Sequence, residues 1–186
     1  MRNMLTSKIF MDLKFNNYSK DAKVVSLALE DNTKFDRILY LENYDYLLTD
    51  NTGWLPGDSA VKNRILTYGV PKFQDGIHAF YITKANFVAK INEYLANYTK
   101  VQIMTYDPLS WILFVDLFGT IEDLPNVIDP IPTFLPSVFI TKGMALNTDV
   151  ERYIGDVTGS PVDYNALYDV IEYRKAYNKA LNLLCE

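Results

Sequence analysis

The chain has 186 residues, a formal net charge of −5, 49% hydrophobic residues and 22% charged residues. This is ordinary globular composition, and the length allows a substantial core in one domain spanning residues 1–186. The acidic balance argues against a protein that coats nucleic acid nonspecifically, although a local basic groove remains open.

The single cysteine, Cys185, excludes an intrachain disulfide and a cysteine-rich zinc cluster. No apolar run approaches the roughly 20 residues that a membrane-spanning helix needs, and the N-terminus lacks the shape of a signal peptide. We therefore expect a soluble, cytoplasmic protein with no membrane partner.

Three short runs at the start of the chain are predicted to form antiparallel strands. They cover residues 8–15, 24–30 and 35–41, and short turns separate them, which is typical of a meander. Residues 43–58 are rich in turn formers and are predicted to be loop. Residues 59–67 are predicted to form a short helix.

The middle of the chain predicts a helix, a strand and a second helix. Apolar residues recur at helical spacing from residue 85 to 98, after Thr83 as the N-cap. Residues 101–106 are predicted to be the fourth strand. Asp107 followed by proline is typical of a helix start, and this helix is predicted to end at Gly119.

The last part of the chain predicts one more strand and two more helices. Residues 127–128 are predicted to form a short fifth strand, residues 134–141 a helix, and residues 142–159 mostly loop. Asp163 is predicted to cap a final helix, because apolar residues after it recur at helical spacing. These positions are Ala166, Leu167, Val170, Ala176, Tyr177, Ala180, Leu181 and Leu184.

A strand, a long helix and another strand in succession favour a parallel crossover, here joined to the antiparallel meander. The predicted fold is therefore α/β. It has a mixed sheet in which strands 1–3 are antiparallel and strands 4–5 parallel, with helices on both faces.

Three stretches carry polar residues in otherwise apolar surroundings. Residues 11–15 read MDLKF, residues 110–119 read SWILFVDLFG, and residues 164–169 read YNALYD. In order and spacing they resemble the motifs of the DnaQ-like, ribonuclease H-like 3′–5′ exonucleases, nearest the bacterial and phage exoribonuclease-like branch. The family's motifs are Asp-x-Glu-Phe, an aspartate that opens a helix ending in Leu-Phe-Gly or Leu-Trp-Gly, and His-Asn-Ala-Leu-x-Asp.

The resemblance implies a ribonuclease H-like fold and two-metal phosphodiester chemistry. In this family four carboxylates hold two divalent ions, which activate water and stabilise the leaving oxygen, and a histidine acts as base. Several acids are needed because magnesium prefers hard oxygen ligands.

At the catalytic positions that the resemblance implies, this chain keeps only some of the family's residue types. Asp12 and Asp169 match the family's acids and are the candidate metal ligands. Lys14 stands at the position of the family's glutamate, Ser110 at its second aspartate and Tyr164 at its histidine.

Neither the only histidine nor the tyrosine restores the missing base. His78 lies in another sequence context. A sister branch of the superfamily uses a tyrosine four residues before the last aspartate. Tyr164 lies at the histidine spacing instead, five residues before Asp169.

Asp12 and Lys14 are two residues apart on one predicted strand, so their side chains share a face of the sheet. Two carboxylates facing each other in a cleft repel, and a cation between them relieves this repulsion. We therefore expect Lys14 to pair with Asp12 and Asp169 and to occupy the first metal position.

Alternative interpretations stay open for the replaced positions. In the simplest of them Lys14 is a solvated lysine at a strand edge, Ser110 a first-turn serine and Tyr164 a packing residue at a helix start. Another four basic residues are candidates either for contacts to a phosphate backbone or for a solvated helix face. They are Arg152, Arg174, Lys175 and Lys179.

Two functions follow from the resemblance. In the first, the chain is a degenerate exonuclease without two-metal catalysis that binds a single-stranded nucleic-acid end, a nucleotide, or a host or replication protein. In the second, Asp12 and Asp169, with Asp107 or Asp116, hold a weakly bound Mg²⁺ or Mn²⁺ ion and support slow 3′–5′ cleavage.

The cofactor expectation is thus none, or weakly bound Mg²⁺ or Mn²⁺, and a homodimer remains open. The frequency of the family in phages, with the Asn, Lys, Ile and Tyr usage of this chain, fits a phage or AT-rich bacterial source. A phage source would place the protein in the cytoplasm of the infected host cell.

Overall fold

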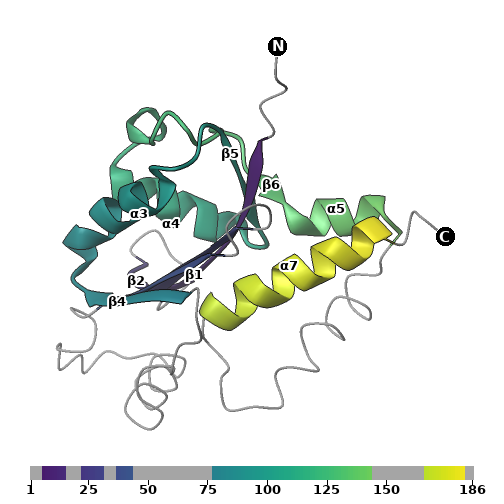
Figure 1. Ribbon diagram of the computed structural model, residues 1–186, viewed down its shortest axis with the longest axis horizontal. Helices are drawn as coiled ribbons and strands as arrows, with labels where there is room; N and C mark the ends of the chain where they lie inside the picture. Colours follow the sequence, from purple (N-terminus) through teal and green to yellow (C-terminus); the bar gives the residue numbers. More distant parts are fainter. Residues whose placement is uncertain (1–5, 16–21, 32–36, 44–76, 144–165, 183–186) are drawn as a thin grey trace, which may run out of the picture.

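The computed structural model describes residues 6–15, 22–31, 37–43, 77–143 and 166–182 (Figure 1). The predicted helix over 59–67, most of the predicted loops over 43–58 and 142–159, and the predicted cap Asp163 lie outside the described residues, as do Tyr164 and Arg152.

An antiparallel meander forms the centre of the sheet, as predicted. It consists of β1 (Ser7–Phe15), β2 (Val24–Asp31) and β3 (Ile38–Asn43). Opposite β1, Asp12 pairs with Ala28 and Lys14 with Ser26. β5 (Val101–Thr105) runs parallel to β1 on its other side. The predicted parallel crossover is confirmed by the parallel pairing of β5 with β6 (Thr133–Phe134), which follows it after a helix.

The described strands form one six-stranded mixed sheet in the order β4-β3-β2-β1-β5-β6. The prediction of five strands was wrong in number, because β4 (Ile77–Ile82) adds a further strand parallel to β3 at the edge. The position of the last strand was also wrong: β6 is Thr133–Phe134, parallel to β5, whereas Ile128 makes only an isolated bridge to Val101.

The described helices follow the predicted positions closely. They are α3 (Phe87–Leu95), α4 (Pro108–Phe118), α5 (Leu135–Thr141) and α7 (Ala166–Asn182), with short 3₁₀ turns at Lys84–Asn86 and Ile121–Asp123. The predicted cap of α4 is confirmed, because the Asp107 carboxylate accepts a hydrogen bond of 2.8 Å from the backbone N–H of Leu109. α4 ends at Gly119, whose φ of 113° lies where glycine is favoured.

Helices cover both faces of the sheet, α3 and α4 on one side and α5 and α7 on the other (Figure 1). β1 therefore buries apolar side chains on both of its faces, because helices cover the sheet on both sides. Ile9, Met11 and Leu13 pack in the core with α3 and α4, whereas Phe10 packs in the core with α5 and α7. Because strand side chains alternate, Asp12 and Lys14 share the face that α7 covers.

Candidate functional site

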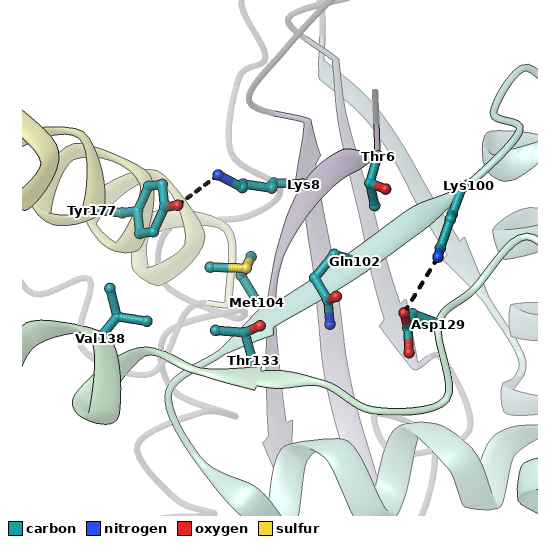
Figure 2. Close-up of a pocket in the computed structure, with 9 residues that line it drawn as sticks. All are labelled: Thr6, Lys8, Lys100, Gln102, Met104, Asp129, Thr133, Val138 and Tyr177. Atoms are coloured by element: carbon teal, nitrogen blue, oxygen red, sulfur yellow. Dashed lines mark hydrogen bonds and ion pairs between the residues drawn. The ribbon is translucent and has the colours of Figure 1, made fainter. Parts of the chain in front are cut away.

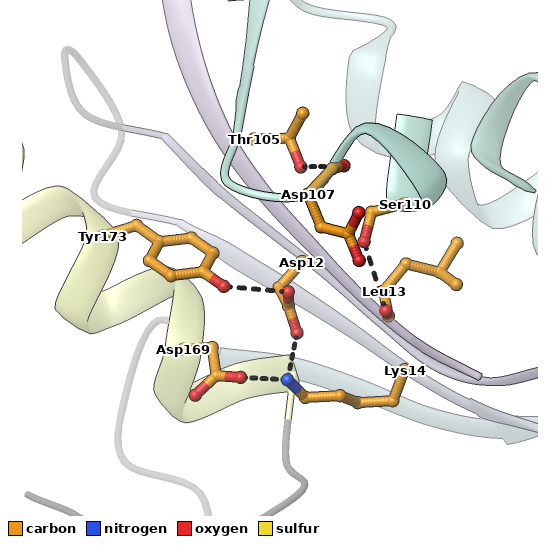
Figure 3. A network of polar contacts seen from close by, with 8 residues as sticks. All are labelled: Asp12, Leu13, Lys14, Thr105, Asp107, Ser110, Asp169 and Tyr173. Carbon is orange, nitrogen blue, oxygen red and sulfur yellow. Dashed lines mark hydrogen bonds and ion pairs between the residues drawn. The ribbon is translucent and has the colours of Figure 1, made fainter. Parts of the chain in front are cut away.

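A cluster of charged side chains lies between the C-terminal half of β1 and the start of α7 (Figure 3). Asp12 and Lys14 come from β1, and Asp169 comes from the first turn of α7. The two carboxylates are 157 positions apart in the chain and meet because α7 packs along β1 and β2.

The ammonium of Lys14 bridges the two carboxylates. Its Nζ lies 2.9 Å from Oδ2 of Asp12, and it donates a hydrogen bond to Oδ2 of Asp169. The exposed fractions of the three side chains are 19% for Lys14, 5% for Asp12 and 27% for Asp169, so the cluster is mostly buried. The predicted contact of Lys14 with both carboxylates is therefore confirmed, and the alternative of a solvated strand-edge lysine is wrong.

Burial and charge act in opposite directions on the Lys14 ammonium. Burial lowers the pKa of Lys14, but the charges of Asp12 and Asp169 together outweigh it, and the pKa is raised above its ordinary value. The ammonium is thus charged at neutral pH.

For the carboxyl group of Asp169, the effect of burial on the pKa outweighs the effect of the Lys14 charge. Burial, followed by the nearby charge of Asp12, raises the pKa of Asp169 to about 6, although Lys14 acts to lower it. The Lys14 ammonium therefore does not offset the combined effect of burial and of the Asp12 charge on the pKa of this carboxyl group.

Tyr173 completes the cluster, and its part in the cluster was not predicted from the sequence. Its hydroxyl donates a hydrogen bond of 3.2 Å to Oδ1 of Asp12, and its ring stacks on Tyr106 at 5.6 Å between centroids. Burial, then the charges of Asp12 and Asp169, raise the pKa of Tyr173 well above its ordinary value, so its hydroxyl keeps the proton. The signal was available, since residues four apart share one face of a helix and Asp169 lies four positions earlier.

Ser110 lies beside the cluster rather than within it. It is buried, and its hydroxyl donates to the backbone carbonyl of Leu13 at 3.4 Å, which places the start of α4 next to β1 (Figure 3). Among the described residues this is the only hydrogen bond of the Ser110 side chain, and it ties α4 to the strand between Asp12 and Lys14.

The other candidate residues do not join the cluster within the described part of the chain. Asp107 uses its carboxylate to cap α4. Asp116 is exposed two turns further along that helix, and His78 is exposed on the edge strand β4. Tyr164 lies outside the described residues.

The side chains of the cluster and of the other described residues do not fit the divalent ions implied by the motif resemblance. Within the described ranges, no group of three or more His, Cys, Asp or Glu side chains is placed to hold a metal ion. The ammonium of Lys14 also lies between the two remaining acids, where it repels a second cation. The arrangement is that of an ion-paired triad.

The basic residues of α7 have partners within the protein. Arg174 Nε lies 2.7 Å from Oε1 of Glu30, a fully buried residue of β2, and Lys175 pairs with Glu172 at 2.7 Å. Lys175 is well exposed, as expected for a solvated helix face. Arg174 contacts the sheet instead, which neither the phosphate-contact nor the solvated-face interpretation predicted.

None of the helices in the described ranges has the length and apolar character needed to cross a membrane. In comparisons with known proteins, no protein-family model matches the chain, and no curated protein sequence matches it.

Proposed function

We propose that this chain is a degenerate relative of the DnaQ-like 3′–5′ exonucleases that has lost two-metal catalysis and acts as a binding or interaction protein. Its ligand in this proposal is a nucleic-acid end, a nucleotide or a protein partner, held at the C-terminal half of β1, beside the first turns of α4 and α7.

The observation that carries the proposal is the position of the Lys14 ammonium between Asp12 and Asp169. In the family, acids at these two positions share a divalent ion. Here a side-chain cation of this chain takes that place, and it compensates part of the carboxylate charge without offering an activated water.

Two further features support the proposed relationship to the DnaQ-like exonucleases. The sheet joins an antiparallel meander to parallel strands on the far side of β1, which is the arrangement implied by the ribonuclease H-like resemblance. Ser110, which the motif resemblance aligns with the family's second aspartate, lies at the start of α4 and reaches β1 beside the triad.

The competing function is a residual metal-dependent exonuclease that uses Asp12, Asp169 and Asp107. The capping bond from Leu109 weighs against it, because one oxygen of the Asp107 carboxylate is already an acceptor for the helix N-terminus.

A nuclease assay separates the two functions. The purified chain is incubated with end-labelled single-stranded RNA or DNA and Mn²⁺, with Asp12→Ala as the matched variant. The proposal predicts intact substrate with both proteins even at high protein concentration. Shortening from the 3′ end that disappears in Asp12→Ala would establish the residual enzyme and overturn the proposal.

Binding to nucleic acid is then measured by filter retention over a range of salt concentrations. A nucleic-acid partner predicts retention that falls steeply with salt, because contacts to phosphates release counterions. Absence of retention at low salt would leave a nucleotide or a protein as the partner.

A further inference from the structure

A second polar site lies at the other end of β1, on the same face of the sheet and under the C-terminal half of α7 (Figure 2). It is a cavity of about 290 Å³. Lys8, whose side chain lines it, precedes Asp12 by four residues, a distance of roughly 13 Å along a strand. The cavity is therefore separate from the triad.

Lys8 and Tyr177 form one side of the cavity. The Lys8 ammonium donates a hydrogen bond of 2.7 Å to the Tyr177 hydroxyl and lies 5.0 Å from the centroid of the Tyr177 ring. Because that hydroxyl oxygen is an acceptor here, its own proton is free to point elsewhere. Within the described ranges no carboxylate pairs with the Lys8 ammonium. The contacts of this partly buried cation are with the hydroxyl and the ring of Tyr177.

The opposite side of the cavity carries a weaker, exposed ion pair. Lys100 Nζ lies 3.8 Å from Oδ2 of Asp129, and the Lys100 side chain is 55% exposed. Exposed pairs of this kind hold their partners weakly. The cavity lining thus has two ammonium groups and one carboxylate, an excess of one positive charge.

Between these sides the lining combines hydrogen-bonding and apolar groups. Thr133 of β6 offers a hydroxyl, whereas Met104 of β5 and Val138 of α5 offer apolar contact (Figure 2). Small-molecule sites have this character, an apolar wall with a few polar groups that fix orientation, and about 300 Å³ is the lower end of their size range.

We propose that this cavity binds a compact ligand through an oxyanion, either a phosphate or a carboxylate. The Lys8 ammonium and the Tyr177 hydroxyl donate to the oxyanion, and Met104 and Val138 contact the body of the ligand. The proposal is independent of the function proposed for the triad, since none of its residues takes part there.

The test uses the methionine methyl signals of the full chain labelled with [methyl-¹³C]methionine. Met104 lines the cavity, whereas Met11 is buried on the opposite face of the sheet and serves as an internal control. Each of the two signals is assigned from a methionine-to-leucine variant. The protein is titrated with inorganic phosphate in one series and with benzoate in another, both at constant ionic strength.

We expect a saturable shift of the Met104 methyl signal with at least one probe, while the Met11 signal stays in place. Saturation with phosphate alone identifies a phosphate ligand, and saturation with benzoate alone identifies a carboxylate ligand with an apolar body. No saturable shift with either probe would overturn the proposal.

Variants test which groups hold the oxyanion. Lys8→Met should weaken probe binding about tenfold or more, because it removes a charge-assisted hydrogen bond. Tyr177→Phe, which keeps the ring, should weaken it about fivefold. Lys90→Met, on α3 at the other face of the sheet, should leave it unchanged. Unaltered affinity in both Lys8→Met and Tyr177→Phe would contradict the assignment of the site.

Discussion

The Lys14 ammonium lies 2.9 Å from the Asp12 carboxylate, two residues earlier on the same strand. The same ammonium donates a hydrogen bond to Asp169 in the first turn of the last helix. One cation thus joins β1 to α7 and separates two acids that would otherwise repel. The ion-paired triad is therefore a structural contact as well as the centre of the proposed function.

Lys14→Met should destabilise the protein by about 3 kcal/mol at neutral pH, because removing one partner of a buried ion pair leaves uncompensated carboxylates. Urea unfolding measures the loss. The control is Lys90→Met: Lys90 pairs with Glu93 at 2.7 Å on the exposed surface of α3, and its loss should cost about 0.5 kcal/mol or less. Equal losses in the two variants would show that the triad contributes no more than a surface pair.

The pH dependence of stability should report the Asp169 carboxyl group. Its pKa is raised from 3.8 to about 6 in the folded protein, so the folded state holds this proton more tightly than the unfolded state. The stabilisation from the protonated group is fully present below the unfolded pKa and is lost as the pH rises through the folded pKa.

The unfolding free energy of the unmodified protein, minus that of Asp169→Asn, should therefore fall between about pH 4 and pH 7, by at most about 1.4 kcal/mol per pH unit. Chemical denaturation at several pH values measures this difference. A difference that grows with pH would mean that Lys14 dominates and lowers the Asp169 pKa.

The hydrogen bond from Tyr173 to Asp12 should be detectable as a coupling between the two residues. Tyr173→Phe removes the donor to a buried carboxylate oxygen and should cost about 1–3 kcal/mol. In a double-mutant cycle with Asp12→Asn, a coupling energy of about 1 kcal/mol or more is expected, because the two side chains are in contact. Strict additivity would contradict the hydrogen bond.

Arg174 should stabilise the protein rather than bind phosphates. Its guanidinium lies beside the fully buried Glu30. Arg174→Met should therefore cost about 2–4 kcal/mol in unfolding free energy. The control is Lys90→Met, which should cost about 0.5 kcal/mol or less because its partner Glu93 is exposed. A neutral Arg174→Met variant would remove this contact from the account.

The sequence predicted the parts of the site that follow local periodicity. The two-residue period of a strand places Lys14 beside Asp12. The pair Asp107-Pro108 and the glycine at 119 predicted α4 almost to the residue. Helical spacing after residue 163 predicted α7, which carries Asp169.

The features that were missed depend on long-range contacts. β6 has only two residues, and its position is set by pairing with Met104 and Thr105 rather than by its own pattern. β4 is ordered by the free edge of β3, which no local pattern reveals. The Glu30–Arg174 contact likewise forms only once α7 lies on the sheet.

Calorimetric titration with Mn²⁺ of the unmodified protein and of Lys14→Glu tests the central claim most directly. The account predicts no tight binding by the unmodified protein. It predicts binding that is about tenfold or more tighter in Lys14→Glu, because that variant replaces a competing cation with a third oxygen ligand. Tight Mn²⁺ binding by the unmodified protein, with no gain in Lys14→Glu, would contradict the claim that Lys14 occupies the place of a metal ion.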